Sequence, residues 1–300
     1  MEKLDKKKGS HAMSYLKRDG ADIYYEVVGD QDKPTFIFVP GANGTGDIFS
    51  KAAKYLTYRF KVVMFDRRGY GKSKLTKPLP DSVSDPHDTY RIKTDAADIN
   101  ALAKEVSPDE PVYIMGSSSG SIVAMEVLQD FPEIVKEIAF HEPPLNSYLP
   151  NSAEHEAHNE HNVELFKEGK PQEAFMGFAK FMNLDKLDGE MMGKQDPNDT
   201  PEEQERKQKE RGNWFLYEIR QYTSRKIDVE GFKKYSDRIN LLIGTDSLIG
   251  MDGTPIYPVK RAKELAKIWN VPYYEIPGAH LGYTQKPEGF GTTLAAVLWK

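Results

Sequence analysis

The 300-residue sequence contains no cysteine, which excludes disulfide bonds, thiolate nucleophiles and cysteine-ligated zinc sites. It also contains no apolar run approaching the ~18 residues that a membrane-spanning helix needs. Its basic N-terminus is not followed by the apolar segment of a secretory signal. These absences predict a cytoplasmic protein without a membrane partner.

Neither sign of charge is in large excess. The chain has 41 Lys and Arg against 46 Asp and Glu, for a net charge of −5. This slightly acidic balance argues against nucleic acid as a partner. Residues 1–12 are typical of a leader or a non-native tail, so we expect the fold to begin at Met13. The sequence makes no prediction of oligomeric state.

Apolar strands alternate with helical segments in two parts of the chain. We expect strands at 23–28, 35–39, 61–65, 111–115, 138–140, 239–243 and 273–276. We expect helices at 47–58, 93–106, 119–129, 258–269 and 287–300. Continuous apolar strands separated by helices are typical of a parallel sheet covered on both faces. The fold class is therefore α/β, with a doubly wound, mostly parallel sheet.

Residues 150–225 interrupt this alternation. They are rich in Glu, Lys, Gln, Asn and Met, with helical spacing and no apolar strand. We interpret them as an inserted helical cap, with the core formed by residues 13–149 and 226–300. Residues 197–211 are almost wholly polar and predict a solvated helix or loop. His155, His158 and His161 recur at three-residue steps that drift around a helix, so we interpret them as a solvated face and predict no metal and no cofactor.

A glycine- and serine-rich turn lies between an expected strand and an expected helix. Residues 116–120 read Gly-Ser-Ser-Ser-Gly and match the G-x-S-x-G pattern of a nucleophile elbow, with Ser118 at its centre. Any side chain at either glycine would collide with the adjoining strand or helix. The sequence therefore predicts Ser118 as a nucleophile.

A serine nucleophile needs a base, and the base needs a carboxylate. His280 follows an expected strand and is the candidate base. Asp246, after the strand at 239–243, is the favoured acid. Glu142, after the strand at 138–140, is the alternative, and Asp252 is a distant third.

Two backbone amides should stabilise the oxyanion. Ser119, at the start of the helix after the nucleophile, is expected to supply one. Ala42, in the Gly-rich loop after the strand at 35–39, is expected to supply the other, with Asn43 beside it contacting substrate. Trp214 and Tyr217 belong to an aromatic cluster that either packs the cap onto the core or covers an acyl pocket.

Taken together, these motifs resemble the serine-dependent α/β-hydrolase superfamily, from about residue 20 to residue 300. The resemblance rests on Pro40-Gly-Ala-Asn-Gly44, where the family often has H-G-x-x-G, on Asp66-Arg-Arg-Gly-Tyr-Gly-Lys-Ser73, on the elbow and on Gly278-Ala-His280. It implies Ser118 as nucleophile, His280 as base, Asp246 as acid and residues 150–225 as a cap. The acid motif, Gly244-Thr-Asp246, is one residue shorter than the commoner G-x-x-D, which leaves Glu142 open.

The expected function is a serine hydrolase that acts on a small carboxylic ester, or a related acyl substrate, through an acyl-enzyme. The alternative is a ligand-sensing or signalling protein that keeps the same fold but turns over slowly. In that case the polar segment 197–211 would serve a partner.

Overall fold

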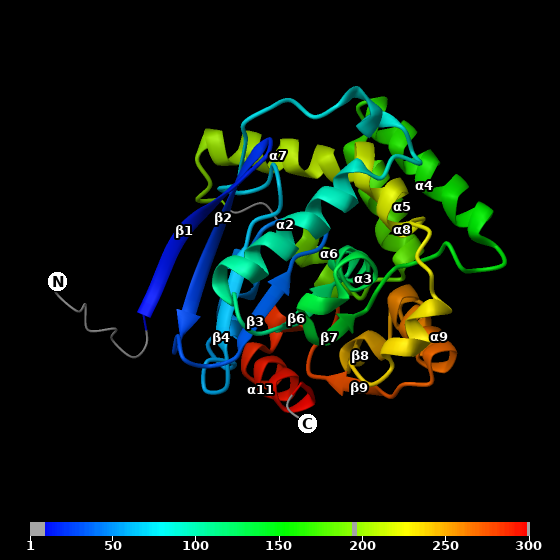
Figure 1. Cartoon of the computed structure of the whole chain (residues 1–300). Coiled ribbons are helices and arrows are strands. Elements are labelled where there is room, and N and C mark those ends of the chain that lie inside the picture. The colour runs from blue at the N-terminus through cyan, green and yellow to red at the C-terminus, as the bar shows by residue number, and fades with distance from the viewer. Residues whose placement is uncertain (1–9, 194–196, 299–300) are drawn as a thin grey trace.

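The computed structural model describes residues 10–193 and 197–298, which form a twisted sheet flanked by helices (Figure 1). Its strands run in the order β1-β2-β4-β3-β6-β7-β8-β9, with β5 beside β2. Their bounds are β1 (Ser10–Arg18), β2 (Ala21–Gly29), β3 (Thr35–Val39), β4 (Lys61–Phe65), β5 (Lys74–Leu75), β6 (Val112–Ser117), β7 (Val135–His141), β8 (Ile239–Gly244) and β9 (Tyr273–Ile276). From β4 to β9 every pairing is parallel, whereas β1, β2 and β5 pair antiparallel. The predicted fold class is confirmed.

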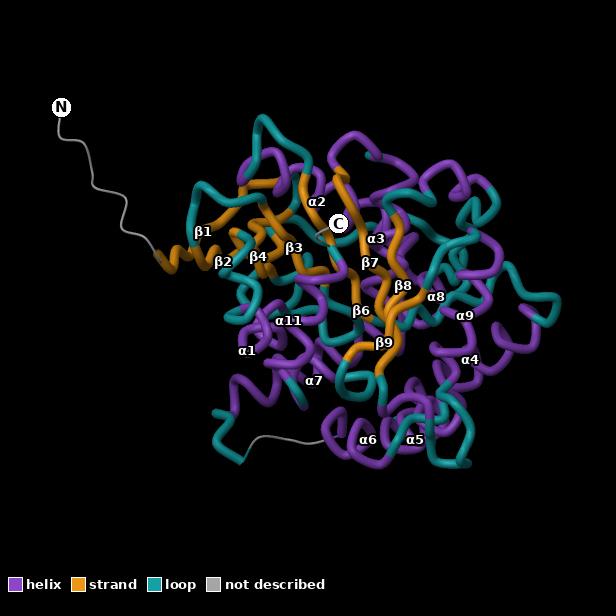
Figure 2. Tube along the Cα trace, turned by 90° about the horizontal axis from the view of Figure 1, so that it is seen from below, coloured by secondary structure: helices purple, strands orange, loops and turns teal. Residues whose placement is uncertain are grey.

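Helices cover both faces of the sheet (Figure 2). On one face lie α2 (Tyr90–Val106), α3 (Ser119–Asp130) and α9 (Tyr257–Trp269), whose buried side chains share a core with β6 and β8. On the other lie α1 (Ser50–Ala53) and α11 (Pro287–Val297), which pack on β3 and β4. The remaining short elements are α10 (Gly282–Gln285) and the 3₁₀ turns η1 (Gly46–Phe49), η2 (Asp81–Ser84), η3 (Pro132–Ile134), η5 (Gly231–Tyr235) and η6 (Asp246–Leu248).

The central strands are apolar because they have no solvent-facing side. All five residues of β3 are buried, between parallel neighbours β4 and β6 and between two helical layers. Such strands read as continuous apolar runs rather than alternating ones. The bounds of β3 and β4 therefore coincide with those predicted from the sequence, and those of the edge strand β9 coincide as well.

The chain between β7 and β8 is helical, and we call residues 150–225 the helical insertion. It contains α4 (Ser152–Lys167), α5 (Pro171–Met182), α6 (Lys186–Gly193), α7 (Pro201–Asn213), the π-helical turn η4 (Trp214–Glu218) and α8 (Ile219–Thr223). A capping box starts α7: the Thr200 side chain accepts from the Glu203 amide, and the Glu203 side chain accepts from the Thr200 amide. The polar segment 197–211 thus forms most of a helix.

Two expectations about local structure were wrong. The fold begins before Met13, because β1 starts at Ser10, which pairs with Gly29. Residues 1–9 lie outside the described residues. The second error concerns His155, which is only 8% exposed and packs against the rings of Phe181 and Tyr257. That face of α4 is covered by aromatic side chains, so it is not solvated at His155.

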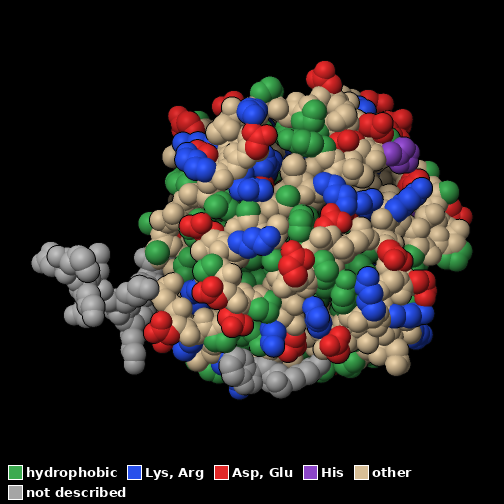
Figure 3. Space-filling view, in the orientation of Figure 1, with side chains coloured by type: hydrophobic (Ala, Val, Ile, Leu, Met, Phe, Trp, Pro, Cys, Tyr) green, Lys and Arg blue, Asp and Glu red, His purple; other side chains and the backbone are tan. Residues whose placement is uncertain are grey.

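Positive and negative side chains alternate over the visible face of the molecule (Figure 3). Within the described ranges, we find no helix with both the length and the apolar character needed to cross a membrane. The same residues contain no group of three or more His, Asp or Glu side chains placed to share a metal ion.

Candidate active site

Ser118 lies at a sharp turn between β6 and α3. Its backbone has φ 55° and ψ −129°, a conformation that side-chain-bearing residues rarely adopt. A Cβ added at Gly116 would lie 2.4 Å from the Gly120 carbonyl oxygen, and one added at Gly120 would lie 2.4 Å from the Val39 carbonyl oxygen. Both glycines are therefore required by close backbone packing, as an elbow demands.

Only the central serine of the turn reaches open space. Ser117 and Ser119 are fully buried, whereas Ser118 is partly exposed and lines a cavity. The Ser118 amide donates to the His141 carbonyl oxygen at 2.9 Å, which ties the turn to β7. The elbow thus presents a single hydroxyl to the cavity.

His280 follows β9 and pairs with a buried carboxylate. Its Nδ1 lies 2.6 Å from Oε2 of Glu142, and both side chains are at most 1% exposed. The other oxygen of Glu142 accepts the Gly244 amide at 2.8 Å. His280 Nε2 is buried and has no hydrogen-bond partner among the described residues. Glu142 thus fixes the tautomer, and Nε2 remains as the nitrogen able to take a proton.

The electrostatics of this pair favour a charged carboxylate. Burial alone would raise the pKa of Glu142, but the hydrogen bond from His280 and the nearby imidazoles outweigh it and lower that pKa to about 2. Burial would likewise lower the pKa of His280, but the hydrogen bond to Glu142 and its charge raise it. A protonated imidazole at His280 is therefore stabilised.

The favoured acid of the sequence analysis, Asp246, does not reach the histidine. Its side chain is 44% exposed and pairs with Lys286 at 2.7 Å. Its backbone amide is held by the Gly278 carbonyl oxygen at 3.0 Å, at the start of η6. The short Gly-Thr-Asp turn leaves the Asp246 side chain on the surface, so the expected pairing was wrong. Asp252 is also remote, because it binds Thr254 and Asn183 on an exposed loop.

The loop after β3 packs directly on the elbow. A Cβ at Gly41 would lie 2.8 Å from the Ser117 carbonyl oxygen and 3.1 Å from Ser118 Cβ. Ala42 follows and lines the cavity with Ser118. Ser119 is the first residue of α3, where amides have no partner within the helix. The two residues predicted to supply oxyanion donors therefore flank Ser118.

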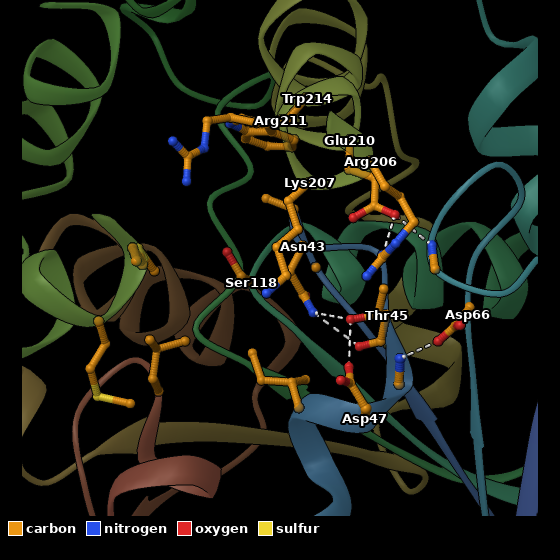
Figure 4. Close-up of a pocket in the computed structure, with 18 of the residues that line it drawn as sticks. Asn43, Thr45, Asp47, Asp66, Ser118, Arg206, Lys207, Glu210, Arg211 and Trp214 are labelled. Carbon is orange, nitrogen blue, oxygen red and sulfur yellow. Dashed lines mark hydrogen bonds and ion pairs between the residues drawn. The ribbon is translucent and has the colours of Figure 1, made fainter. Parts of the chain in front are cut away.

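A cavity of about 590 Å³ separates the elbow from the helical insertion. Ser118 and Asn43 lie on one side of it, and Arg206, Arg211 and Trp214 project from the opposite side (Figure 4). Asn43 and Trp214 thus line the cavity. Tyr217 does not line it. Tyr217 lies three residues further along η4, where the Arg91 guanidinium lies 5.8 Å from its ring centre.

Comparison with known proteins agrees with the fold described above. A family model described as alpha/beta hydrolase fold matches residues 34–182. The uncharacterized hydrolase YraK of Bacillus subtilis is 27% identical over 286 residues, which cover 95% of each protein. A hydrolase from Pseudomonas aeruginosa superposes with a TM-score of 0.66 at 16% identity, covering 96% of this chain and 98% of that one. The esterase EaEST from Exiguobacterium antarcticum gives 0.65 at 17% identity, covering 96% and 99%. The chain has the α/β-hydrolase fold.

In this α/β-hydrolase fold, a buried arginine links the loop after β3 to the helical insertion. Arg67, 1% exposed, donates to the Gly41 carbonyl oxygen at 2.9 Å, to Asp95 at 2.7 Å and to Glu218 of η4 at 2.7 Å. Glu218 also pairs with Arg91. Burial opposes the charge on Glu218, but the two arginines lower its pKa. The sequence around Glu218 gives no sign of this role, because its partner Arg67 lies 151 residues away in the chain.

The cavity of this α/β-hydrolase fold is lined by both charged and apolar side chains. Among the charged ones, Glu210 of α7 accepts from Arg206 at 2.7 Å and from the Gly71 amide at 2.7 Å. The apolar lining includes side chains of α5, α6 and η4, namely Phe175, Phe178, Met191, Met192 and Phe215. The polar segment predicted as a solvated helix therefore forms part of the cavity wall.

Proposed function

We propose that this protein is a serine hydrolase that cleaves small carboxylic esters through an acyl-enzyme. The observation that carries the proposal is the buried Glu142–His280 pair, with its free Nε2, in the same cavity as the elbow serine Ser118. A serine hydroxyl is a weak nucleophile until a base removes its proton, and this arrangement supplies that base with its own carboxylate.

The reaction begins when His280 Nε2 takes the proton of Ser118 and the Ser118 oxygen attacks the ester carbonyl. The tetrahedral intermediate collapses as the C–O bond to the alcohol breaks, and the alcohol leaves with the proton from His280. Water then loses a proton to His280 and attacks the acyl-enzyme, which releases the acid and restores Ser118. Hydrogen bonds between base and nucleophile are often long without substrate and tighten when it binds.

The oxyanion would be held by the amides of Ala42 and Ser119. Support comes from the close packing of Gly41 on the elbow and from the position of Ser119 at the start of α3. The helix N-terminus adds a partial positive charge where negative charge develops.

The apolar side chains that line the cavity favour a short acyl or aromatic group over a charged one. Most of its Phe and Met side chains come from the helical insertion, which we propose acts as a cap over Ser118. A site of this size suits a small ester. The names of two similar proteins, a hydrolase and an esterase, point to the same reaction class.

A fluorophosphonate probe tests the proposal, because it forms a covalent bond only with an activated serine. Intact mass and peptide mapping should show one adduct, on Ser118. Ser118→Ala should remove it, whereas Ser117→Ala, which alters a fully buried neighbour, should keep it. A folded wild-type protein without an adduct would overturn the proposal and favour a ligand-binding protein. With the adduct established, p-nitrophenyl acetate, butyrate and octanoate would define the acyl length.

A further inference from the structure

The helical insertion supplies a buried carboxylate to the loop that carries His280. Asp188, on α6, is fully buried. Its Oδ2 accepts the His280 amide at 2.9 Å, and its Oδ1 accepts the Leu281 amide at 3.0 Å. Oδ1 also accepts from the Gln285 side chain at 2.7 Å. Nothing in the proposed mechanism uses this carboxylate, and it lies 92 residues from the histidine in the sequence.

The backbone of this loop depends on those contacts. Gly278 has φ 105°, so the chain turns sharply before His280 and has no regular structure until α10. Buried amides require an acceptor. Gln285 accepts the Ala279 amide at 2.8 Å, and Asp188 accepts the next two. Three consecutive amides are therefore satisfied by one carboxylate and the glutamine bound to it.

The charge of Asp188 also acts on the imidazole. Among the described residues, the titratable groups that act on His280 come from two places: His141 at the end of β7 with Glu142 directly after it, and Asp188 in α6 with Asp185 directly before that helix. After the Glu142 hydrogen bond and charge, the charge of Asp188 is the next influence that raises the pKa of His280. Burial in turn raises the pKa of Asp188 to about 6.

The same helix contacts the substrate cavity. Met191 and Met192, within a turn of Asp188, line the cavity together with His280 and Leu281. Met191 and Met192 of α6 would thus contact the acyl group, while Asp188 of the same helix holds the loop that carries His280. Any displacement of α6 would shift both.

We propose that Asp188 is a positioning residue for His280, through which the helical insertion sets the place and basicity of the catalytic base. This inference rests on the proposed function, because it assigns a role relative to His280 as base. It makes the insertion part of the catalytic apparatus rather than only a cover.

The rate of fluorophosphonate labelling between pH 5 and pH 9 tests this, because it reports proton removal from Ser118 without a natural substrate. Asp188→Asn removes the charge and turns one acceptor into a donor. We expect labelling at pH 8 to slow ~10- to 100-fold, since small misplacements of a catalytic group cost up to ~10² in rate. We also expect the acid limb of the profile to move to lower pH, because an anion that favours the imidazolium is lost.

Two further variants separate position from charge. Gln285→Ala removes the side chain bound to Asp188 and to the Ala279 amide but leaves the charge, so labelling should slow without a shift of the acid limb. Glu160→Gln is the control, because it removes a carboxylate of the helical insertion that pairs with Arg220. Its labelling rate and the acid limb of its pH profile should both match those of the wild type. The melting temperature of each variant shows whether it is folded.

The outcomes distinguish the two proposals. Wild-type protein that is not labelled at Ser118 overturns the proposed function itself. If the wild type is labelled and Asp188→Asn has the same rate and acid limb, the positioning role is wrong. If Asp188→Asn does not fold, Gln285→Ala decides: an unchanged labelling rate overturns the role, and a slower rate with an unchanged acid limb supports it.

Discussion

Oε2 of Glu142 lies 2.6 Å from Nδ1 of His280, although 138 residues separate the two in the sequence. Glu142 reaches this position from a strained backbone, with φ 50°, directly after β7. The Gly244 amide holds its second oxygen at 2.8 Å. Both oxygens of the carboxylate are therefore held by hydrogen bonds.

Glu142→Gln should lower kcat for p-nitrophenyl acetate by a factor on the order of 10⁴, by analogy with the loss of the acid in other triads. The glutamine would leave the imidazole in the wrong tautomer and the imidazolium unpaired. Asp246→Asn is the matched control, since the exposed side chain of Asp246 contacts only Lys286 and the neighbouring Thr245 hydroxyl among the described residues, and it should keep kcat within about twofold. A large loss in Asp246→Asn with full activity in Glu142→Gln would reverse the assignment of the acid.

The strained backbone at Ser118 predicts that a glycine variant is more stable than an alanine variant at this position. Ser118→Ala and Ser118→Gly both lose the hydroxyl, but only glycine adopts a φ of 55° without steric cost. Such strain costs of order 1–3 kcal/mol, and the flexibility of glycine in the unfolded chain offsets part of its relief. Urea denaturation should therefore show the glycine variant to be more stable than the alanine variant by about 1 kcal/mol.

Ser147 provides the control, because it is not among the residues with positive φ and its hydroxyl makes one hydrogen bond, to the Arg225 carbonyl oxygen. There the order should invert, with Ser147→Gly less stable than Ser147→Ala. The same order at both positions would contradict strain at the elbow.

Trp214 and Tyr217 should differ in their effect on substrate binding. Trp214 lines the cavity, whereas Tyr217 lies outside it, beside Arg91. Trp214→Leu removes apolar contact area and should raise KM for p-nitrophenyl butyrate by ~3- to 10-fold, since 1.4 kcal/mol of lost contact is tenfold in affinity. Its kcat should change less than about twofold. Tyr217→Leu should leave KM unchanged, and an equal rise in both variants would place the acyl group elsewhere.

The sequence predicted the sheet because its central strands are apolar on both faces, and it predicted Ser118 because the elbow needs glycines at fixed places. The sequence did not decide between Glu142 and Asp246 as the acid, and the reason is physical. Glu142 and Asp246 both follow strands that are neighbours in the sheet, β7 and β8, so both carboxylates come to the same edge. Which one turns inward depends on backbone angles after each strand, and no residue pattern records these.

Other residues left no signal because their partners are distant in the sequence. Asp188 lies in α6 and Glu218 at the end of η4. Carboxylates on helices are normally exposed, yet both of these are fully buried. β1 was missed for a related reason: it is an edge strand with exposed side chains, so it lacks the apolar run that identified β3.

His141 predicts a loss of stability in mild acid. It is fully buried beside the elbow, with Nδ1 3.2 Å from the Ser117 hydroxyl. Burial lowers its pKa from 6.5 to about 4, despite the opposing charge of Glu142. Between these two values the unfolded chain binds a proton that the folded chain does not, so the free energy of unfolding falls as the pH drops from 6.5 towards 4.

Urea denaturation of the wild type and His141→Asn at pH 7 and pH 4.5 isolates this contribution. Glu142, whose pKa is lowered to about 2, contributes stability above its unfolded pKa of 4.5 and loses it only below that pH. Asp188, whose pKa is raised to about 6, increases the free energy of unfolding as the pH falls, and it does so in both proteins. At about 1.4 kcal/mol per pKa unit, the wild type should lose about 2–3 kcal/mol more than His141→Asn over this range. Equal losses would mean that His141 is protonated in the folded state at pH 4.5, and that the Ser117 contact does not require a neutral ring.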